Sequence, residues 1–573
     1  MIKSCKPHKQ PLLVAAISMA AMNPAQALDF YSGGIEGSLT SQISIGSTWR
    51  MEEAADFITT GKPNSNDGDA NYDKGDVVSQ IFKGRHDLQM DYENVGAFIR
   101  GKYWHDFALS DNDVNAGQTS NGFVPSTSAL DDSNNNELSK FSGAVLLDAF
   151  VYGEFDVADI PLDVRLGKQV LSWGESTFIM GGINAINPFD VASFRRPGAT
   201  LKEGLIPINM AYANLGLSDS LNLEAFYLLE YQETVLEGCG TFFSTTDYVA
   251  EGCNGVLTPA GTVLRVDDDK PSASGQFGVA MRYVSEALGD TEFGFYAMNI
   301  HSRSPMVSML VDAGSLATPG DESHNYRVVY PEDQQLAAVS FATTVGTMAL
   351  SGEVTHKKDV PLQIKDSLLI TSALANNVTA LSAFYPGTVG SLGALGSSEL
   401  DAQVTAAYDA SVVSGSPVEV AGYQRHDISQ AQVTAIKLID QLGPIDRIAL
   451  IGEVGYTFVH DLAQGDDVIR YDTSVDNITE GSWGYRTRIV SQFNNVFAGV
   501  NLTPTISWKK DVKGYSPNPG GNFREGRETL GLKLKADYLS TYSAALSYTR
   551  YGAGENNKIT DRDFASITVG MSF

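Results

Sequence analysis

The last ten residues of the chain alternate between apolar and small or polar side chains. The apolar positions are Ala565, Ile567, Val569, Met571 and Phe573, and Phe564 is the one large residue on the opposite face. A period of two over this length indicates a β-strand whose two faces meet different environments. A soluble sheet can end in such a strand, and so can a barrel whose outer face meets lipid, so the preceding segments must decide between them.

Residues 1–27 have the three parts of a secretory signal peptide. Lysines at positions 3, 6 and 9 form a basic region, residues 11–22 are apolar but too short to span a bilayer, and Ala25-Gln26-Ala27 offers a small-residue cleavage site. We therefore expect a signal peptide at 1–27 and one mature domain at 28–573. The alternative is that the stretch is a buried N-terminal helix.

The mature chain contains no stretch near the roughly 18 uninterrupted apolar residues of a membrane helix. An exported chain that spans a membrane without helices must form a closed barrel, because only closure satisfies every backbone hydrogen bond in lipid. The 55 glycines, 24 tyrosines and 26 phenylalanines suit the tight strand crossings and aromatic girdles of such a barrel. The net charge of −28 argues against nucleic-acid binding and against a polybasic membrane anchor.

Alternating segments recur along the mature chain and predict an all-β fold, an antiparallel transmembrane barrel of about 18 strands, with a range of roughly 14 to 18. The clearest segments are Gly37–Trp49, Leu162–Val170, Leu221–Leu229, Phe277–Tyr283, Met348–Val354, Ile448–Phe458, Val496–Leu502, Leu530–Tyr538 and Phe564–Phe573. An even strand number places both termini on one side of the membrane. We therefore expect Phe564–Phe573 to pair with Gly37–Trp49 and remove both sheet edges.

The connections between these segments alternate between short and long, as periplasmic turns and outer loops do in outer-membrane barrels. Short connections are expected at Val157–Pro161, Leu217–Ser220, Glu286–Asp290, Asn494–Asn495 and Leu539–Tyr542. Long ones are expected at Glu53–Asp76, Leu109–Lys140, Ser172–Leu205, Tyr231–Pro271, Ser302–Glu332, Asp359–Arg425 and Val459–Ser482.

Two of the long connections are candidates to fill the lumen. Residues 172–205 are apolar and Gly-rich, and as a solvent loop they would expose many large apolar side chains. We therefore predict that this segment folds inward as a plug or constriction. Residues 359–425 form the second candidate, in which Leu368–Phe384 has helical apolar spacing and could form an amphipathic loop helix, a lid or a second plug.

Strand parity assigns charged residues to the lumen, because the apolar neighbours should meet lipid. This predicted charge network consists of Arg50, Arg165, Glu224, Arg282, Glu353, Glu453, Lys533, Lys535 and Asp537. It could brace the barrel wall as salt bridges, select polar solutes, or do both.

The candidate plug supplies the predicted binding residues. Its apolar side chains would form a pocket for a hydrophobic molecule: Trp173, Phe178, Ile179, Met180, Ile183, Ile186 and Phe189. Three cations, Arg195, Arg196 and Lys202, would catch a carboxylate or phosphate if the cargo has one. The alternative role for all ten residues is packing of the plug and its attachment to the wall.

Three smaller features carry further expectations. Cys239 and Cys253 lie in one polar segment and should pair as a loop disulfide in an oxidising compartment. Asp67, Asp69, Asn71 and Asp73 place oxygens at every second residue with an early glycine, which resembles part of a calcium loop, although the closing Glu is absent. The alternative is a polar structural turn without a metal ion. Trp173-Gly174-Glu175-Ser176-Thr177 lacks the second glycine of a nucleophile elbow, and no Ser–His pairing is evident, so we do not expect an enzyme.

Several ordered phrases across nearly the whole mature chain together resemble one family. They include Leu166-Gly-Lys-Gln-Val-Leu-Ser-Trp-Gly-Glu175, Arg196-Pro-Gly198, Leu223-Glu-Ala-Phe-Tyr227, Cys239-Gly-Thr-Phe-Phe243, Tyr330-Pro-Glu-Asp333, Ser482-Trp-Gly-Tyr485 and Asp561-Arg-Asp-Phe564. The chain is similar to the proteobacterial family of domain of unknown function 1302.

That resemblance implies a large barrel in the outer membrane of a Gram-negative bacterium, surrounded by lipid and lipopolysaccharide. Genes of the family often accompany an exporter-family inner-membrane protein and a periplasmic lipid-carrier-like protein. The resemblance therefore implies transport of a small hydrophobic compound, such as an alkane, terpenoid, sterol or lipid, with those two proteins as partners. A diffusion porin for polar solutes, and a structural or docking partner of an inner-membrane pump, are the alternatives.

Overall fold

The terminal strand lies beside the first long strand of the chain, and this pairing closes a barrel. β26 (Phe564–Ser572) runs antiparallel to β2 (Ile35–Arg50), with Arg50 opposite Phe564 and Gln42 opposite Ser572. β2 pairs on its other side with β3 (Val77–Tyr92), so neither strand leaves an open edge. The expected closing pair is confirmed.

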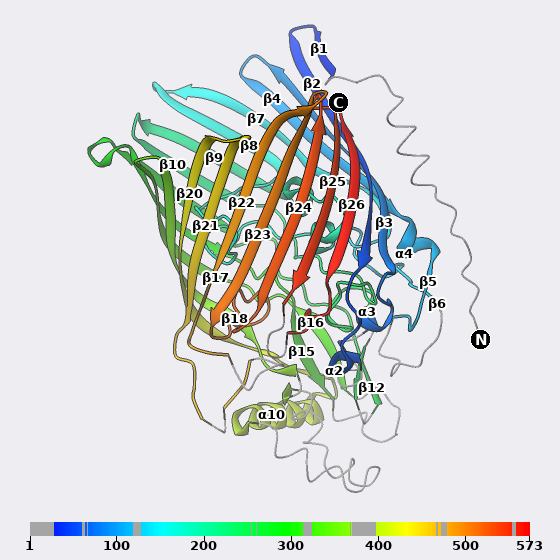
Figure 1. Ribbon diagram of the computed structural model, residues 1–573. Coiled ribbons are helices and arrows are strands. Elements are labelled where there is room, and N and C mark those ends of the chain that lie inside the picture. Colours follow the sequence, from blue (N-terminus) through cyan, green and yellow to red (C-terminus); the bar gives the residue numbers. More distant parts are fainter. Residues whose placement is uncertain are drawn as a thin grey trace, which may run out of the picture.

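The computed structural model shows these strands as a tilted ring with both described chain ends at one rim (Figure 1). It describes residues 28–59, 64–65, 67–118, 128–253, 255–258, 261–312, 324–366, 368–369, 397–465, 468–471, 478–552 and 557–573. The predicted signal peptide, residues 1–27, lies outside the described residues.

The large sheet has 19 strands, of which β1 (Leu28–Ser32) pairs only with the start of β2. The other 18 form the closed antiparallel ring, which confirms the expected barrel and strand number. After β2 and β3, the ring continues with β4 (Val95–Asp106), β7 (Ser142–Val157), β8 (Ile160–Gln169), β9 (Ile208–Ser218), β10 (Leu221–Leu228), β13 (Phe277–Ser285), β14 (Thr291–Ile300), β17 (Gln334–Val345), β18 (Met348–Gln363), β20 (Tyr423–Leu442), β21 (Ile445–Val459), β22 (Gly481–Phe497), β23 (Val500–Lys513), β24 (Glu528–Tyr538), β25 (Tyr542–Tyr551) and β26.

The barrel has a turn end, where short connections and the C-terminus lie, and a loop end, where the long connections lie (Figure 1). One expected turn was wrong. Asn495 lies in a bulge within β22, and the chain reverses at Ala498 and Gly499, which both have positive φ. The predicted strand Val496–Leu502 therefore contains the turn between β22 and β23. The bulge before this turn is stabilised by the Gly499 N–H, which donates to the Asn495 side chain at 2.9 Å.

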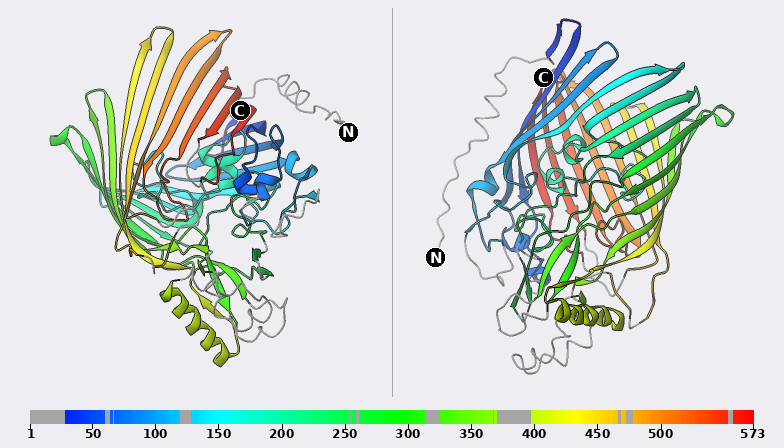
Figure 2. Two further views of the ribbon diagram at one scale, coloured as in Figure 1. Left: turned by 60° about the horizontal axis from the view of Figure 1, so that its bottom comes forward. Right: turned by 180° about the vertical axis from the view of Figure 1, so that it is seen from behind.

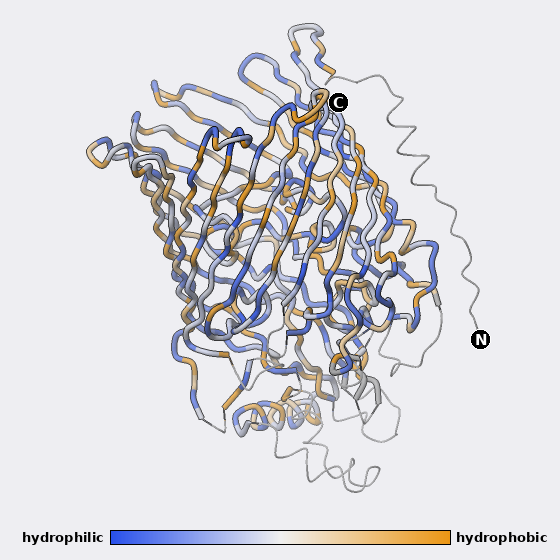
Figure 3. Tube along the Cα trace, in the orientation of Figure 1, coloured by the Kyte–Doolittle hydropathy of each residue, from blue (hydrophilic) through white to orange (hydrophobic). Residues whose placement is uncertain are grey.

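The hydrogen-bond register places exposed apolar side chains in continuous rows around the outer face. One such row joins Leu223, Met281, Phe295, Val339 and Val354 on five neighbouring strands, and all five side chains are exposed. The adjacent row, one residue along each strand, faces inward. Figure 3 shows the resulting alternation of hydrophobic and hydrophilic residues along the barrel strands.

The remaining elements do not belong to the barrel sheet; most of them lie at the loop end, and some of these share a hydrophobic cluster of their own. They are α2 (Asp56–Thr59), α3 (Asp67–Ala70), α4 (Phe107–Asp111), α5 (Val191–Arg195), α6 (Leu201–Gly204), α10 (Ser398–Ser414), the 3-10 helix η1 (Glu286–Leu288, at the turn end) and the short strands β5 (Asp113–Val114), β6 (Ser128–Ala129), β11 (Gly255–Thr258), β12 (Gly261–Leu264), β15 (Met306–Val311), β16 (His324–Val329) and β19 (Val418–Val420). Within the described ranges, no helix has the length and apolar character needed to cross a membrane.

The long connection between β18 and β20 contains a helix that the sequence pattern did not predict. α10 begins after Ser397, whose side chain accepts from the N–H of Leu400, and ends at Gly415 with φ +67°. Most of the predicted helix at 368–384 lies outside the described residues. β18 and β20 also extend further than expected, so the connection runs from 364 to 422.

Candidate functional site

The connection between β8 and β9 runs inside the ring of strands rather than over its rim. We call residues 170–207 the inner segment; it contains α5 and α6, the small teal helices within the barrel in Figure 2. Side chains on the inner face of the barrel hold it, as described below.

Two carboxylates of the inner wall bind the backbone of the inner segment. Glu453 on β21 accepts hydrogen bonds from the N–H groups of Thr177, Phe178 and Ile179 at 2.7 to 2.8 Å. Glu353 on β18 accepts from the N–H of Glu175 at 2.6 Å and of Ile183 at 2.9 Å. Each carboxylate thus satisfies backbone donors that a segment without regular structure leaves free.

Two glycines permit this close approach. A Cβ atom at Gly182 would overlap Glu353 Oε1, and a Cβ at Gly174 would lie 2.5 Å from Glu353 Oε2. Gly174 also has φ +87°, which other L-residues rarely adopt. The glycine-rich sequence of the segment is therefore required where its backbone meets the wall.

Apolar side chains attach the segment to the neighbouring part of the wall. The Trp173 ring is 1% exposed, lies 5.0 Å from the ring of Phe226 and 5.8 Å from that of Tyr296, and donates its Nε1–H to Glu224 at 2.8 Å. Ile183 and Ile186 are buried in the same cluster. Burial of an indole with a paired N–H is a strong anchor.

The other side of the segment is held by lysines from a distant part of the ring. Lys83 on β3 lies 2.7 Å from Glu203, and Lys102 on β4 lies 2.8 Å from Asp190; both lysines are buried. β4, which carries Lys102, and β21, which carries Glu453, are separated by nine strands around one side of the ring and by seven around the other. The inner segment is therefore fastened to opposite walls of the barrel.

The predicted apolar pocket residues differ in how far they are buried. Trp173, Ile179, Ile183 and Ile186 are buried against the wall, and Phe178 and Phe189 are half-buried. Met180 alone among the seven is exposed, at 52%. In this arrangement most of the predicted residues attach the segment to the barrel.

The predicted anion-binding cations are mostly engaged as well. Arg195 donates to the Tyr551 hydroxyl at 2.9 Å, and the Arg196 guanidinium lies over the Trp104 ring at 4.4 Å. Lys202 is exposed, 3.8 Å from Asp87.

All nine predicted lumen residues occupy inner-face positions, but their partners differ. Glu224, Glu353 and Glu453 hold the inner segment, Arg282 bridges Glu224 and Glu292, and Lys535 pairs with Asp537 at 2.7 Å. Arg165 lies over the Tyr212 ring. The carboxylates of the predicted charge network thus bind the candidate plug. The sequence patterns predicted the network and the plug separately and did not predict this contact between them.

Sequence reasoning missed two groups on the inner face, which lie level with Glu453 or between it and the turn end. Ile436, Leu438, Ile451 and Val490 are inner-face apolar residues of β20–β22, which we call the apolar patch. Leu438 is 48% exposed. Arg486, Arg488 and Lys509 are inner-face cations of β22 and β23. The inner-face position of Arg486 and Arg488 could have been predicted from the sequence. Trp483 and Ile489 are apolar and face outward, so the alternation along β22 places the two arginines inward.

The turn with four spaced oxygens is held by protein groups. Asp69 lies 2.7 Å from Arg562 and 3.4 Å from Arg50, and the Asn71 side chain bonds to backbone groups of Ala116, Gly117 and Gly240. Asp67 is buried in α3, and Asp73 is exposed. In the described part of the chain no three His, Cys, Asp or Glu residues are grouped to hold a metal ion. Calcium binding stays a prediction.

Burial raises the pKa of Asp69 to about 7, although Arg562 and Arg50 oppose this shift and the Asp561 carboxylate adds to it. Burial also raises the pKa of Glu175 in the inner segment, which Arg282 partly opposes. These carboxyl groups therefore keep protons more readily than exposed ones do.

The expected disulfide is present: Cys239 and Cys253 are bonded, with their Cα atoms 5.6 Å apart.

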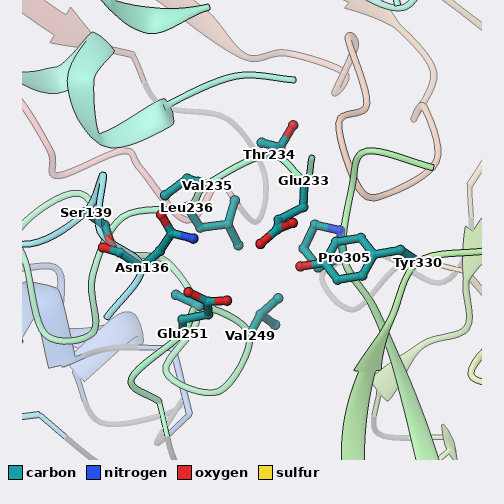
Figure 4. Close-up of a pocket in the computed structure, with 11 residues that line it drawn as sticks. Asn136, Ser139, Glu233, Thr234, Val235, Leu236, Val249, Glu251, Pro305 and Tyr330 are labelled. Atoms are coloured by element: carbon teal, nitrogen blue, oxygen red, sulfur yellow. The ribbon is translucent and has the colours of Figure 1, made fainter. Parts of the chain in front are cut away.

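Beside the disulfide lies a cavity of about 20 Å³, into which Glu233, Glu251 and Tyr330 point (Figure 4). That volume admits one water molecule and excludes a larger compound. A depression of about 550 Å³ on the outer face, lined by Met281, Phe295 and Val339, faces the expected lipid.

Comparisons with known proteins give one family and several solved barrels. The family described as "Protein of unknown function (DUF1302)" matches residues 10–573. A search of curated proteins finds no match. The chain is similar to crystal structures of Acinetobacter baumannii OccAB3 (8% identity, 93% of this chain and 99% of that one, TM-score 0.39), A. baumannii OccAB1 (10%, 95% and 97%, 0.40) and Pseudomonas aeruginosa OccK2 in complex with glucuronate (9%, 94% and 97%, 0.37).

Proposed function

The chain belongs to the family of proteins of unknown function DUF1302, and from this premise we propose that it carries a small hydrophobic compound across the outer membrane of a Gram-negative bacterium. The compound classes are those that a lipopolysaccharide leaflet excludes, such as alkanes, terpenoids, sterols or lipids. The route is the barrel lumen, narrowed by the inner segment.

The outer face supports the placement in a membrane. Rows of exposed apolar side chains follow the hydrogen-bond register, and a closed ring leaves no backbone edge for lipid to meet. The turn end would face the periplasm and the loop end the outside, because the short turns, Leu28 at the start of the described residues and the C-terminal strand lie together.

The inner segment acts in this proposal as a constriction. Its attachments to β3 and β4 on one side and to β18 and β21 on the other cross the lumen. An 18-stranded barrel without such a segment would hold a wide aqueous channel. A constriction attached on both sides would pass single molecules rather than a continuous stream of water.

One observation carries the hydrophobic part of the proposal: apolar side chains line the lumen beside the constriction. Leu438 is 48% exposed on the inner face, next to Ile436 and Ile451, while Met180 projects from the segment with 52% exposed. A water-filled channel for polar solutes would be destabilised by such a surface, because apolar area in water is unfavourable by about 25 cal/mol per Å². The apolar patch therefore favours hydrophobic cargo over a diffusion porin.

The test is uptake of radiolabelled 1-dodecanol by cells whose lipopolysaccharide-bearing outer membrane carries the protein, compared with matched cells lacking it. We expect faster uptake with the protein and a loss of most of that gain in Leu438→Gln. Ala545→Gln, an inner-face position on β25 away from the patch, is the matched control. Equal uptake with and without the protein overturns the proposal.

Single-channel recording separates the alternatives. A large, steady ohmic conductance of the purified protein would favour the diffusion porin. No protein-dependent uptake, together with recovery of a complex with an inner-membrane pump, would favour the docking role.

A further inference from the structure

We propose that the cargo of this barrel is an amphiphile with one anionic head group, of the carboxylate class, bound by Arg488, Lys509 and Lys533 on the inner wall. This inference rests on the proposed function and names its substrate class. The three cations lie on neighbouring strands β22, β23 and β24, which Figure 1 shows side by side.

The first observation is that these cations have no carboxylate partner. Within the described residues none of the three forms an ion pair, whereas Arg486 and Arg527 nearby share Asp511 at 2.8 and 2.6 Å. Lys533 is repelled by Lys535 and Arg488, and Lys509 by Arg486 and Arg527. The carboxylates that attract these two lysines, Asp537 and Asp511, are themselves paired with Lys535 and with the two arginines. A local excess of cations in a chain of net charge −28 needs a separate cause.

The second observation is a space between the cations. Arg488 on β22 lies opposite Ser507 on β23, and Ser507 lies opposite Gly531 on β24. Across these strands, the two inner-face residues next to Arg488 are therefore small. A Cβ atom at Gly531 would meet only Ser507, at 3.7 Å. Lys509 and Lys533 are one inner-face position away, about 7 Å along their strands, which long side chains can span.

The third observation fixes which end of the ligand lies where. The same row continues in the other direction from Arg488 to Ile451 and then Ile436 of the apolar patch. Phe178 of the inner segment lies with its ring 4.7 Å from the Arg488 guanidinium carbon. One continuous strip of wall is therefore apolar at one end and cationic at the other.

This strip matches an anionic head with an apolar tail. The head would accept hydrogen bonds from Arg488 and the lysines over Gly531, and its negative charge would offset their mutual repulsion. The tail would cover Ile451, Ile436 and Leu438. Arg488 also touches the constriction through Phe178, so a bound head group would lie directly beside the segment that narrows the lumen.

Photolabelling of the full-length protein in lipid nanodiscs tests the site. A diazirine analogue of dodecanoate should label the apolar patch, with dodecanoate competing and 1-dodecanol, the same chain without charge, competing at least about tenfold more weakly. Arg488→Gln and Lys533→Gln should each weaken competition by dodecanoate by about tenfold or more. Arg447→Gln is the matched control, an inner-face cation of β21 already paired with Asp440 at 2.7 Å.

Gly531→Leu keeps every charge but fills the space, so it should abolish competition by dodecanoate while the variant folds and inserts normally. Equal competition by dodecanoate and 1-dodecanol, or unchanged competition in Arg488→Gln and Gly531→Leu, overturns the inference. The uptake assay separates the two failures. If 1-dodecanol enters through the protein without any preference for dodecanoate, this inference fails and the proposed function stands; if neither compound enters, the proposed function fails.

Discussion

Glu453 on β21 accepts a hydrogen bond from the backbone N–H of Phe178 at 2.7 Å. With the N–H groups of Thr177 and Ile179 on the same carboxylate, three backbone donors depend on one side chain. Hydrogen bonds to a buried charge contribute about 1.5–3 kcal/mol each. We therefore expect Glu453→Ala to release this part of the inner segment and to increase single-channel conductance in planar bilayers.

Asp537→Ala serves as the control for that measurement, because Asp537 is also an inner-face carboxylate but pairs with Lys535 near the turn end. Conductance equal to wild type in Glu453→Ala, with the barrel intact, would show that the remaining anchors hold the segment without Glu453.

Gly182→Ala should loosen the second anchor. The added Cβ would overlap Glu353 Oε1, so the carboxylate must leave the Ile183 N–H or the segment must shift. Overpacking of this kind costs about 1–3 kcal/mol. We expect hydrogen exchange of residues 172–186 to accelerate by about tenfold or more. Gly452→Ala, where a Cβ meets nothing within 4 Å, should leave exchange unchanged; acceleration in both variants would refute the specific role of Gly182.

The barrel was predictable from the sequence because its signal is local. Lipid on one face and lumen on the other impose a period of two on each strand, so the pairing of the last strand with the first long one followed from counting. The anchors of the inner segment were not predictable, since Glu453 and Thr177 are 276 positions apart and no spacing links them. Residues 172–205 were recognised as unsuited to solvent, but the pattern could not show which of their side chains face the wall.

Removal of the disulfide should loosen the loop end and leave the barrel intact. Cys239 and Cys253 enclose a sequence separation of 14, and loop-closure entropy predicts a stabilisation of about 3 kcal/mol. We expect the Cys239→Ser, Cys253→Ser double variant to be cleaved faster by protease within residues 229–276, while the barrel strands remain protected. Mass spectrometry that finds free thiols in the unreduced wild-type protein would contradict the bond itself.

Asp69 should make the loop end sensitive to pH. Both of its oxygens face arginines, Oδ2 at 2.7 Å from Arg562 and Oδ1 at 3.4 Å from Arg50, in a site without solvent exposure. Burial still raises the pKa of Asp69 to about 7, because the lost hydration outweighs these attractions and the Asp561 carboxylate repels.

A carboxyl group with a folded-state pKa above its ordinary value of 3.8 binds its proton more tightly when folded. Its contribution to stability is therefore complete below about pH 4 and is lost as the pH rises through about 7. We expect hydrogen-exchange protection of residues 67–72 and 557–564, corrected for intrinsic rates, to decrease between pH 5 and pH 8. In Asp561→Asn the repelling charge is gone, so the pKa of Asp69 should fall and the loss of protection should move to lower pH. Identical pH profiles for Asp561→Asn and the wild-type protein would mean that Asp69 is not the titrating group.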